Sequence, residues 1–186
     1  MIGYALCGSF CTLSRSLAVL ETLRASGYDV QPIMSEITSK TDTRFGRAAD
    51  FAEKIEALCG HPILRSIPET EPLGPGRPLE ALVICPCTGN TLAKLANGIT
   101  DTAVCMAAKA HLRSDRPLLI ALASNDAMSA NLKNLGALLS RKSVYFVPLT
   151  QDDPVSKPHS LVADFDRAPQ ALKAALEGKQ LRPLFL

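Results

Sequence analysis

Short apolar runs alternate with helix-like segments along most of this chain. The runs expected to form strands are 2–7, 29–34, 81–85, 118–123 and 144–147, with a short one at 63–67. Apolar residues recur at helical spacing in 12–26, 44–59, 90–97, 102–112, 128–139 and 169–177. This alternation predicts an α/β fold: a doubly wound, Rossmann-like or flavodoxin-like parallel sheet with helices on both faces.

The bulk composition favours one globular domain over residues 1–186. Hydrophobic residues make up 47% of the chain and charged residues 20%, and the formal net charge is only +2. No basic run points to nucleic acid, and no apolar run approaches the roughly 18 residues of a membrane span. The first residues indicate a strand rather than a signal peptide, so we expect a cytoplasmic protein with no membrane or nucleic-acid partner.

The cysteines predict core packing rather than chemistry. Their positions are Cys7, Cys11, Cys59, Cys85, Cys87 and Cys105. They form no C-x-x-C pair and have no downstream histidine pair, so we expect no metal site. Small buried thiols in a reducing compartment are the simpler interpretation.

Two proline-containing stretches are expected to be irregular. Pro32 implies an exposed or irregular position within the strand at 29–34. Prolines and glycines crowd 68–78, which we predict to be a loop rather than a domain linker.

Ligands of doubly wound sheets bind outside the carboxyl ends of the strands, so polar groups just after each strand are the candidate site residues. Gly8, Ser9 and Phe10 follow the first strand and open a helix, where free amides and a hydroxyl favour a phosphate. The alternative is that Ser9 or Thr12 only caps the helix.

A second polar loop follows the buried run 81–85. It contains Pro86, Cys87, Thr88, Gly89 and Asn90. Its glycine permits close backbone approach, and its hydroxyl and amide groups suit the edge of a heteroaromatic ring. The alternative role for Asn90 is that of a helix N-cap.

Two further strand ends carry polar residues. Ser124, Asn125 and Asp126 follow the run 118–123, and Asp126 is either a general base or a cap of the next helix. Ser35 follows 29–34 and precedes Arg44, which with Arg47 could grip a carboxylate or phosphate; solvated surface charges are the alternative.

These segments resemble the flavoprotein family, which contains flavin-containing cysteine decarboxylases and flavin prenyltransferases. Pro86–Thr91 is similar to the family loop P-A-S-A-N-T, with Pro86, Asn90 and Thr91 kept. The segment 121–128 is similar to A-P-A-M-N-x-x-M, with Asn125 and Met128 kept.

A closer resemblance, to the B subunits of bacterial dipicolinate synthases, covers nearly the whole chain. The segments that carry it are 43–46, 71–75, 86–90, 100–101, 106–110, 124–127, 145–148 and 151–154. It implies a role in making dipicolinate during sporulation, together with a separate nucleotide-binding A subunit. On this resemblance we expect an oxidoreductase-type enzyme subunit that converts a dihydrodipicolinate precursor.

The resemblance also assigns cofactors and residues. It implies flavin mononucleotide (FMN), with NAD(P) on the partner subunit, and a homo-oligomer that is a trimer or larger. The cofactor-binding residues would be Gly8, Ser9, Phe10, Ser35, Pro86, Cys87, Thr88, Gly89, Asn90 and Ser124. Asn125 matches the asparagine that the decarboxylases use near the substrate carboxylate. From the clustering of polar groups at the strand ends, we further expect Arg44 and Asn125 to bind a small dicarboxylate substrate, and Asn125 and Asp126 to be catalytic.

Two positions differ from the family's motifs and limit the reactions expected of this chain. Pro72 stands where the decarboxylases carry a catalytic histidine, and Met106 stands where the prenyltransferases carry an arginine. Cysteine decarboxylation and prenyl transfer are therefore disfavoured. The remaining alternatives are a non-catalytic or regulatory subunit with the same fold, and an FMN-dependent oxidoreductase of another substrate.

Overall fold

The computed structural model, which describes residues 1–186, is built on a seven-stranded sheet. The strands are β1 (Ile2–Leu6), β2 (Val30–Met34), β3 (Leu82–Thr88), β4 (Leu118–Ser124), β5 (Val144–Phe146), β6 (Leu149–Thr150) and β7 (Leu161–Ala163). Their order is β2-β1-β3-β4-β7-β6, and β5 also pairs with β4. Strands β1 to β5 are parallel, whereas β7 is antiparallel to β4 and β6.

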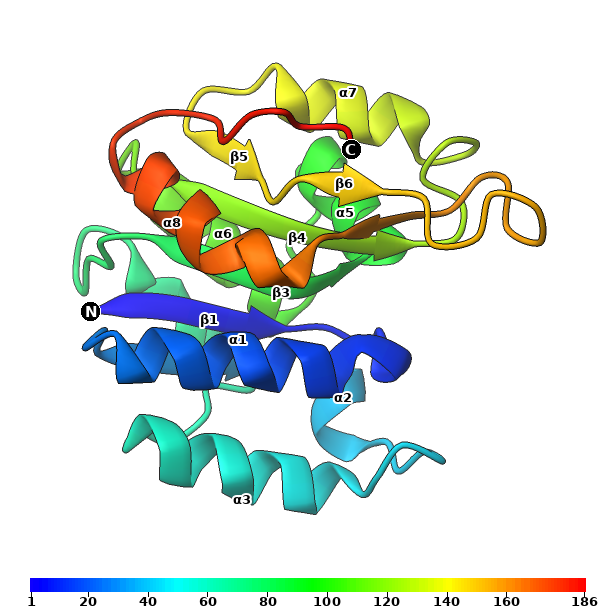
Figure 1. Cartoon of the computed structure of the whole chain (residues 1–186). Helices are drawn as coiled ribbons and strands as arrows, with labels where there is room; N and C mark the ends of the chain where they lie inside the picture. Colours follow the sequence, from blue (N-terminus) through cyan, green and yellow to red (C-terminus); the bar gives the residue numbers. More distant parts are fainter.

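Helices cover both faces of the sheet, as the alternating pattern predicted (Figure 1). The α-helices are α1 (Leu13–Ala25), α2 (Glu36–Lys40), α3 (Ala48–Cys59), α4 (Ile67–Thr70), α5 (Gly89–Asn97), α6 (Ala103–Leu112), α7 (Leu132–Leu139) and α8 (Ala168–Leu176). Helices α1 and α8 pack together on one face, and α5 and α6 pack on the other. No helix is both long enough and apolar enough to cross a membrane.

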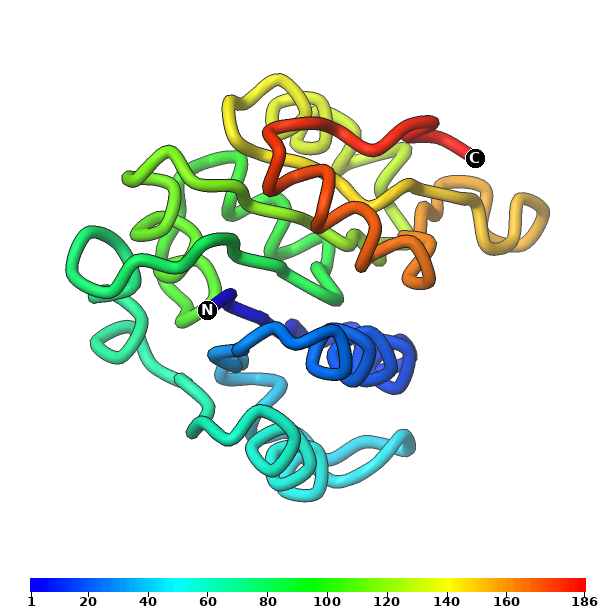
Figure 2. The backbone as a smooth tube through the Cα atoms, turned by 60° about the vertical axis from the view of Figure 1, so that its left-hand side comes forward, coloured from blue at the N-terminus to red at the C-terminus, as the bar shows by residue number.

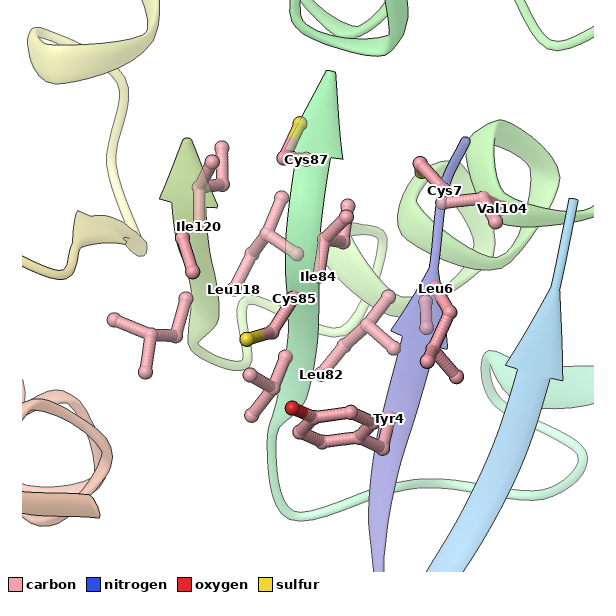
Figure 3. Packing of buried hydrophobic residues seen from close by; sticks show 14 of the residues in the cluster. Tyr4, Leu6, Cys7, Leu82, Ile84, Cys85, Cys87, Val104, Leu118 and Ile120 are labelled. Carbon is pink, nitrogen blue, oxygen red and sulfur yellow. The ribbon is translucent and has the colours of Figure 1, made fainter. Parts of the chain in front are cut away.

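One cluster of 49 buried hydrophobic residues fills the space between the sheet and its helices. Figure 3 shows part of it, with Tyr4 of β1 and Cys85 of β3 on neighbouring strands. The buried Tyr4 hydroxyl donates to the Ser16 carbonyl oxygen, and the Ser16 hydroxyl donates to the Cys85 carbonyl oxygen. The core expectation for the cysteines holds for all but Cys11, which is exposed.

Several predicted boundaries are wrong for local reasons. Helix α3 begins at Ala48 rather than at residue 44, because Thr43 and Gly46 close a turn through mutual backbone hydrogen bonds. Helix α7 begins at Leu132 rather than 128, because the preceding residues form turns. The stretch 68–78 is not all loop, since it overlaps α4 and the 3-10 helix η2 (Glu71–Leu73).

The edges of the sheet also differ from prediction. Strand β2 lies at an edge, where a proline is tolerated, but Pro32 is buried because the segment around Leu64 pairs with the strand. That pairing is a single bridge between Ile33 and Leu64, so 63–67 is not a strand. The short antiparallel strands β6 and β7 carried no apolar run long enough to be recognised.

Burial of His111 gives the fold a pH dependence. The side chain is 1% exposed, and its Nε2 lies 2.9 Å from the Pro117 carbonyl oxygen. Desolvation lowers the pKa of His111 below its usual value. The neutral imidazole therefore makes its full contribution to folding stability above the unfolded-state pKa of about 6.5. This contribution is lost as the pH falls through the lower folded-state pKa. We expect the urea midpoint to drop from pH 7 to pH 5, and the drop to shrink in His111→Gln; an equal drop in both proteins would contradict this origin.

Candidate functional site

A cleft of about 930 Å³ opens at the carboxyl ends of β1, β3 and β4. Its lining residues are Gly8, Ser9, Phe10, Cys11, Thr12, Arg15, Arg44, Phe45, Thr88, Gly89, Asn90, Ala123, Ser124, Asn125, Asp126, Asp152, Lys157, Ser160 and Val162. Strands β1, β3 and β4 point toward the right of Figure 1, where the loops 41–47 and 151–160 also project. Figure 2 shows the same loops at the same side of the tube after rotation. The volume lies within the range of small-molecule and cofactor sites.

The first strand end presents hydroxyl and amide donors to the cleft. The 3-10 helix η1 (Phe10–Thr12) leads directly into α1, so its first amides have no helical partners. Thr12 Oγ1 donates to the Ser9 carbonyl oxygen at 2.9 Å and to Ser9 Oγ at 3.0 Å, and Ser9 makes no side-chain cap. The Ser9 hydroxyl proton therefore remains available to a ligand, and the capping interpretation of Ser9 is wrong.

The β3 end turns the chain sharply into α5. Thr88, rather than Asn90, is the N-cap, because its Oγ1 accepts a hydrogen bond from the Thr91 amide at 3.2 Å. Asn90 is exposed, one residue into the helix, and lines the cleft. Its amide is thus free of the capping role that the sequence left open.

A partly buried polar cluster lies at the β4 end. The Ser124 hydroxyl donates to Asp126 Oδ1 over 2.5 Å, and the Asn131 amide donates to both carboxylate oxygens of Asp126 at 3.0 and 2.9 Å. These hydrogen bonds, that of Ser124 foremost, lower the pKa of Asp126 below its ordinary value. Asp126 is therefore ionised at neutral pH, and it does not cap α7, whose N-cap is Asn131.

Cationic side chains reach the cleft from three different elements. The Arg44 guanidinium lies 4.9 Å from the ring centre of Phe45, and that of Arg15 lies 4.7 Å from the ring centre of Phe165. Neither arginine takes part in an ion pair within the chain. Lys157 Nζ pairs with Asp152 Oδ2 at 2.7 Å, which raises the pKa of the lysine.

Most of the predicted site residues meet in this cleft, but some do not. Pro86 and Cys87 lie within β3 outside the lining, and the Cys87 side chain is fully buried. Ser35 caps α2 by accepting from the Thr38 amide at 3.3 Å, and it too lies outside the lining. Arg47 pairs with Asp50 instead of joining Arg44.

Sequence reasoning missed the contribution of the loop after β6. Asp152, Lys157 and Ser160 line the cleft although they follow no long strand. The signal was weak: the resemblance already included residues 151–154, but it gave them no role. No group of three or more His, Cys, Asp or Glu side chains is arranged to hold a metal ion.

Comparison with known proteins places this geometry in a family. The profile of the family described as Flavoprotein matches residues 1–170. The chain belongs to the flavoprotein family. The predicted resemblance to this family and its predicted fold class are both confirmed by that match and by the relatives below.

The similarity to the B subunits of dipicolinate synthases spans the whole chain of this flavoprotein. It is 44% identical over 185 residues to the B subunit of dipicolinate synthase from Bacillus subtilis (strain 168), covering 100% of this chain and 92% of that protein. The crystal structure of the B subunit of dipicolinate synthase from Bacillus halodurans C superposes with a TM-score of 0.92 and 39% identity, covering 100% of this chain and 95% of that one.

A more distant solved structure shares only the fold. Burkholderia xenovorans DmrB in complex with FMN, described as a cubic protein cage for redox transfer, superposes with a TM-score of 0.69. Its identity is 19%, and the match covers 95% of this flavoprotein and 94% of that chain.

Proposed function

We propose that this flavoprotein binds FMN in the cleft at the ends of β1, β3 and β4. The observation that carries the proposal is the meeting of three separate strand ends, each with polar groups, around one cavity of about 930 Å³. A cofactor with a phosphate at one end and a planar polar ring at the other needs such a divided site. FMN bound to the similar DmrB fold supports the choice of cofactor.

The donor set fits the two ends of FMN separately. Ser9 Oγ, the first amides of η1 and the Arg15 guanidinium are the groups that would hold the phosphate. Thr88, Gly89 and Asn90 would hold the ring system, since they supply a hydroxyl, a side-chain-free surface and an amide beside each other.

We propose that the chain acts as the B subunit of a dipicolinate synthase. Its full-length similarity to two such subunits supports this role. Together with an A subunit that carries NAD(P), it would convert a dihydrodipicolinate precursor to dipicolinate during sporulation. FMN, when bound, supplies a two-electron acceptor for this kind of reaction.

The chain's own residues would bind and orient the substrate. Dipicolinate and its precursors carry two carboxylates, and Arg44 and Lys157 are cationic side chains that line the cleft from two of its rims, the loops 41–47 and 151–160. Asn125, exposed at the β4 end, would donate to a carboxylate from the sheet side. Asp126 would act by its fixed negative charge, because its lowered pKa makes it a weak proton acceptor.

Titration of the purified chain with FMN tests the proposal. We expect saturable binding with a change in flavin absorbance and fluorescence. Ser9→Ala should weaken it about tenfold, the usual effect of losing one hydrogen bond to a charged group. The control is Ser14→Ala, an exposed serine outside the cleft. No measurable affinity, alone or with the A subunit, would favour the non-catalytic alternative.

We also propose that the chain assembles into a homo-oligomer, a trimer or larger. Ile37, Phe45 and Val155 expose 63%, 44% and 90% of their surface, and contacts between subunits would cover such apolar side chains. The cage described for DmrB supports assembly of this fold. Light scattering on the eluted protein measures the mass directly, and a monomeric mass would overturn this part of the proposal.

A further inference from the structure

Two side chains at the β4 end of the cleft, Ser124 and Asp126, offer a ligand only hydrogen-bond acceptors. Ser124 Oγ gives its proton to Asp126 Oδ1, so only its lone pairs remain for a ligand. Ser124 and Asp126 both line the cleft at the end of β4, and their oxygens lie next to each other as one acceptor edge.

Asp126 belongs to this acceptor edge, and hydrogen bonds from Asn131 hold its carboxylate in one orientation. Asn131 points its amide nitrogen at the carboxylate because its own Oδ1 accepts from Asn134 Nδ2 at 2.9 Å. Asn134 Oδ1 in turn accepts from Asn97 Nδ2 at 3.3 Å. Asn131 and Asn134 are each 7% exposed, so reversing either amide would leave buried polar atoms without partners.

The close contact with Gly89 shows how tightly the edge is built. A Cβ on Gly89 would lie within 3 Å of three polar atoms: Ser124 Oγ, Asn131 Nδ2 at 2.8 Å and Asp126 Oδ1 at 2.9 Å. Only a residue without a side chain fits there without displacing these groups.

We propose that Ser124 and Asp126 form an acceptor-only subsite that takes an N–H donor on a ring nitrogen of the ligand. This inference rests on the proposed function and names what the site recognises. A reduced nitrogen heterocycle with two carboxylates offers such a donor in its protonated or N–H form. The aromatic product offers a lone pair at the same position, which the carboxylate of Asp126 repels. The subsite therefore favours substrate over product.

The flavin ring also carries an N–H group, at N3, so the cofactor is a second ligand that could donate to this subsite. The subsite would then orient the cofactor instead of the substrate. Asp126 and Ser124 contact the ligand in either case, whereas Asn131 is a positioning residue that acts through Asp126.

Calorimetry with two matched pairs of dicarboxylates, with and without FMN, tests whether the N–H donor belongs to the substrate. The compound cis-piperidine-2,6-dicarboxylate carries ring N–H donors, and cis-cyclohexane-1,3-dicarboxylate has the same shape without them. Dipicolinate carries a ring lone pair, and isophthalate has a C–H there. We expect the piperidine to bind about tenfold more tightly than the cyclohexane, and dipicolinate more weakly than isophthalate. Asp126→Asn should remove the first preference and reverse the second, since an amide can donate to a lone pair.

A pair of flavins tests whether the N–H donor belongs to the cofactor instead. FMN and 3-methyl-FMN differ in the N3–H, and a tenfold loss for the methylated flavin that disappears in Asp126→Asn would assign the subsite to the cofactor. The wild-type comparisons stand even if the variant does not fold. Equal affinities within every pair, or preferences that survive unchanged in a folded Asp126→Asn protein, overturn the inference. Absence of FMN binding alone instead counts against the proposed cofactor, because the dicarboxylate pairs are also measured without it.

Discussion

Replacing Gly89 with alanine is expected to abolish binding of both flavin and dicarboxylates. The added Cβ would collide with Ser124 Oγ and lie 2.9 Å from Asp126 Oδ1, so the cluster must move away from the end of β4. Alanine is otherwise the better helix former by about 1 kcal/mol, which offsets part of an overpacking cost of about 1–3 kcal/mol. Stability should thus fall by no more than about 2 kcal/mol, while affinity falls at least about a hundredfold because positioning is lost.

The chain supplies its own matched control in Gly136, which lies within α7. A Cβ there meets nothing within 4 Å, so Gly136→Ala should stabilise the protein by roughly 0.5–1 kcal/mol and leave binding unchanged. Urea denaturation and ligand titration of both variants separate the two effects. A Gly89→Ala protein that binds FMN like the wild type would show that the cluster does not shape the site.

Gly89 also shows what the sequence could and could not predict. The strand-loop-helix pattern correctly indicated a turn into a helix at the end of a buried strand, and the glycine was expected to permit close approach of backbone. The structure gives a different partner for that approach: the side chains of Ser124, Asn131 and Asp126, which lie 35 to 42 residues farther along the chain. Local patterns report on local conformation, whereas such a contact depends on the register between β3 and β4.

The same distinction explains which of the other residues could be placed at the cleft. Gly8, Ser9, Phe10, Thr88 and Asn125 were predictable as neighbours because the carboxyl ends of parallel strands must meet at one edge of the sheet. Cys87 was misplaced because β3 continues to Thr88, beyond the point where its apolar run suggested a polar turn, and this continuation buries the side chain.

The loop 151–160 was beyond prediction for a topological reason. It reaches the cleft because it joins β6 to the antiparallel strand β7, and β7 pairs with the end of β4. Strands of two and three residues carry too little alternation to be recognised. Lys157 and Asp152 are therefore cleft residues that only the three-dimensional arrangement reveals.

Under the proposed function, replacing Asn90 and Asn125 together with alanine is expected to abolish dipicolinate formation by the chain reconstituted with the A subunit of a dipicolinate synthase. Both side chains are exposed and line the cleft, and neither caps a helix, so the double variant should keep its fold and unfolding midpoint. Losing two donors that position reacting groups should slow turnover by about a hundredfold or more. Product absorbance measures turnover, with Ser14→Ala as the surface control.

The two single variants make this prediction sharper, because the proposed roles differ. Asn90 is assigned to the flavin ring, so Asn90→Ala should lower FMN affinity and regain part of its activity at high FMN concentration. Asn125 is assigned to a substrate carboxylate, so Asn125→Ala should leave FMN affinity unchanged and raise the KM for the dicarboxylate. Unchanged turnover in the double variant would exclude the cleft as the place of reaction. It would leave the A subunit as the catalytic partner and this flavoprotein as a binding subunit.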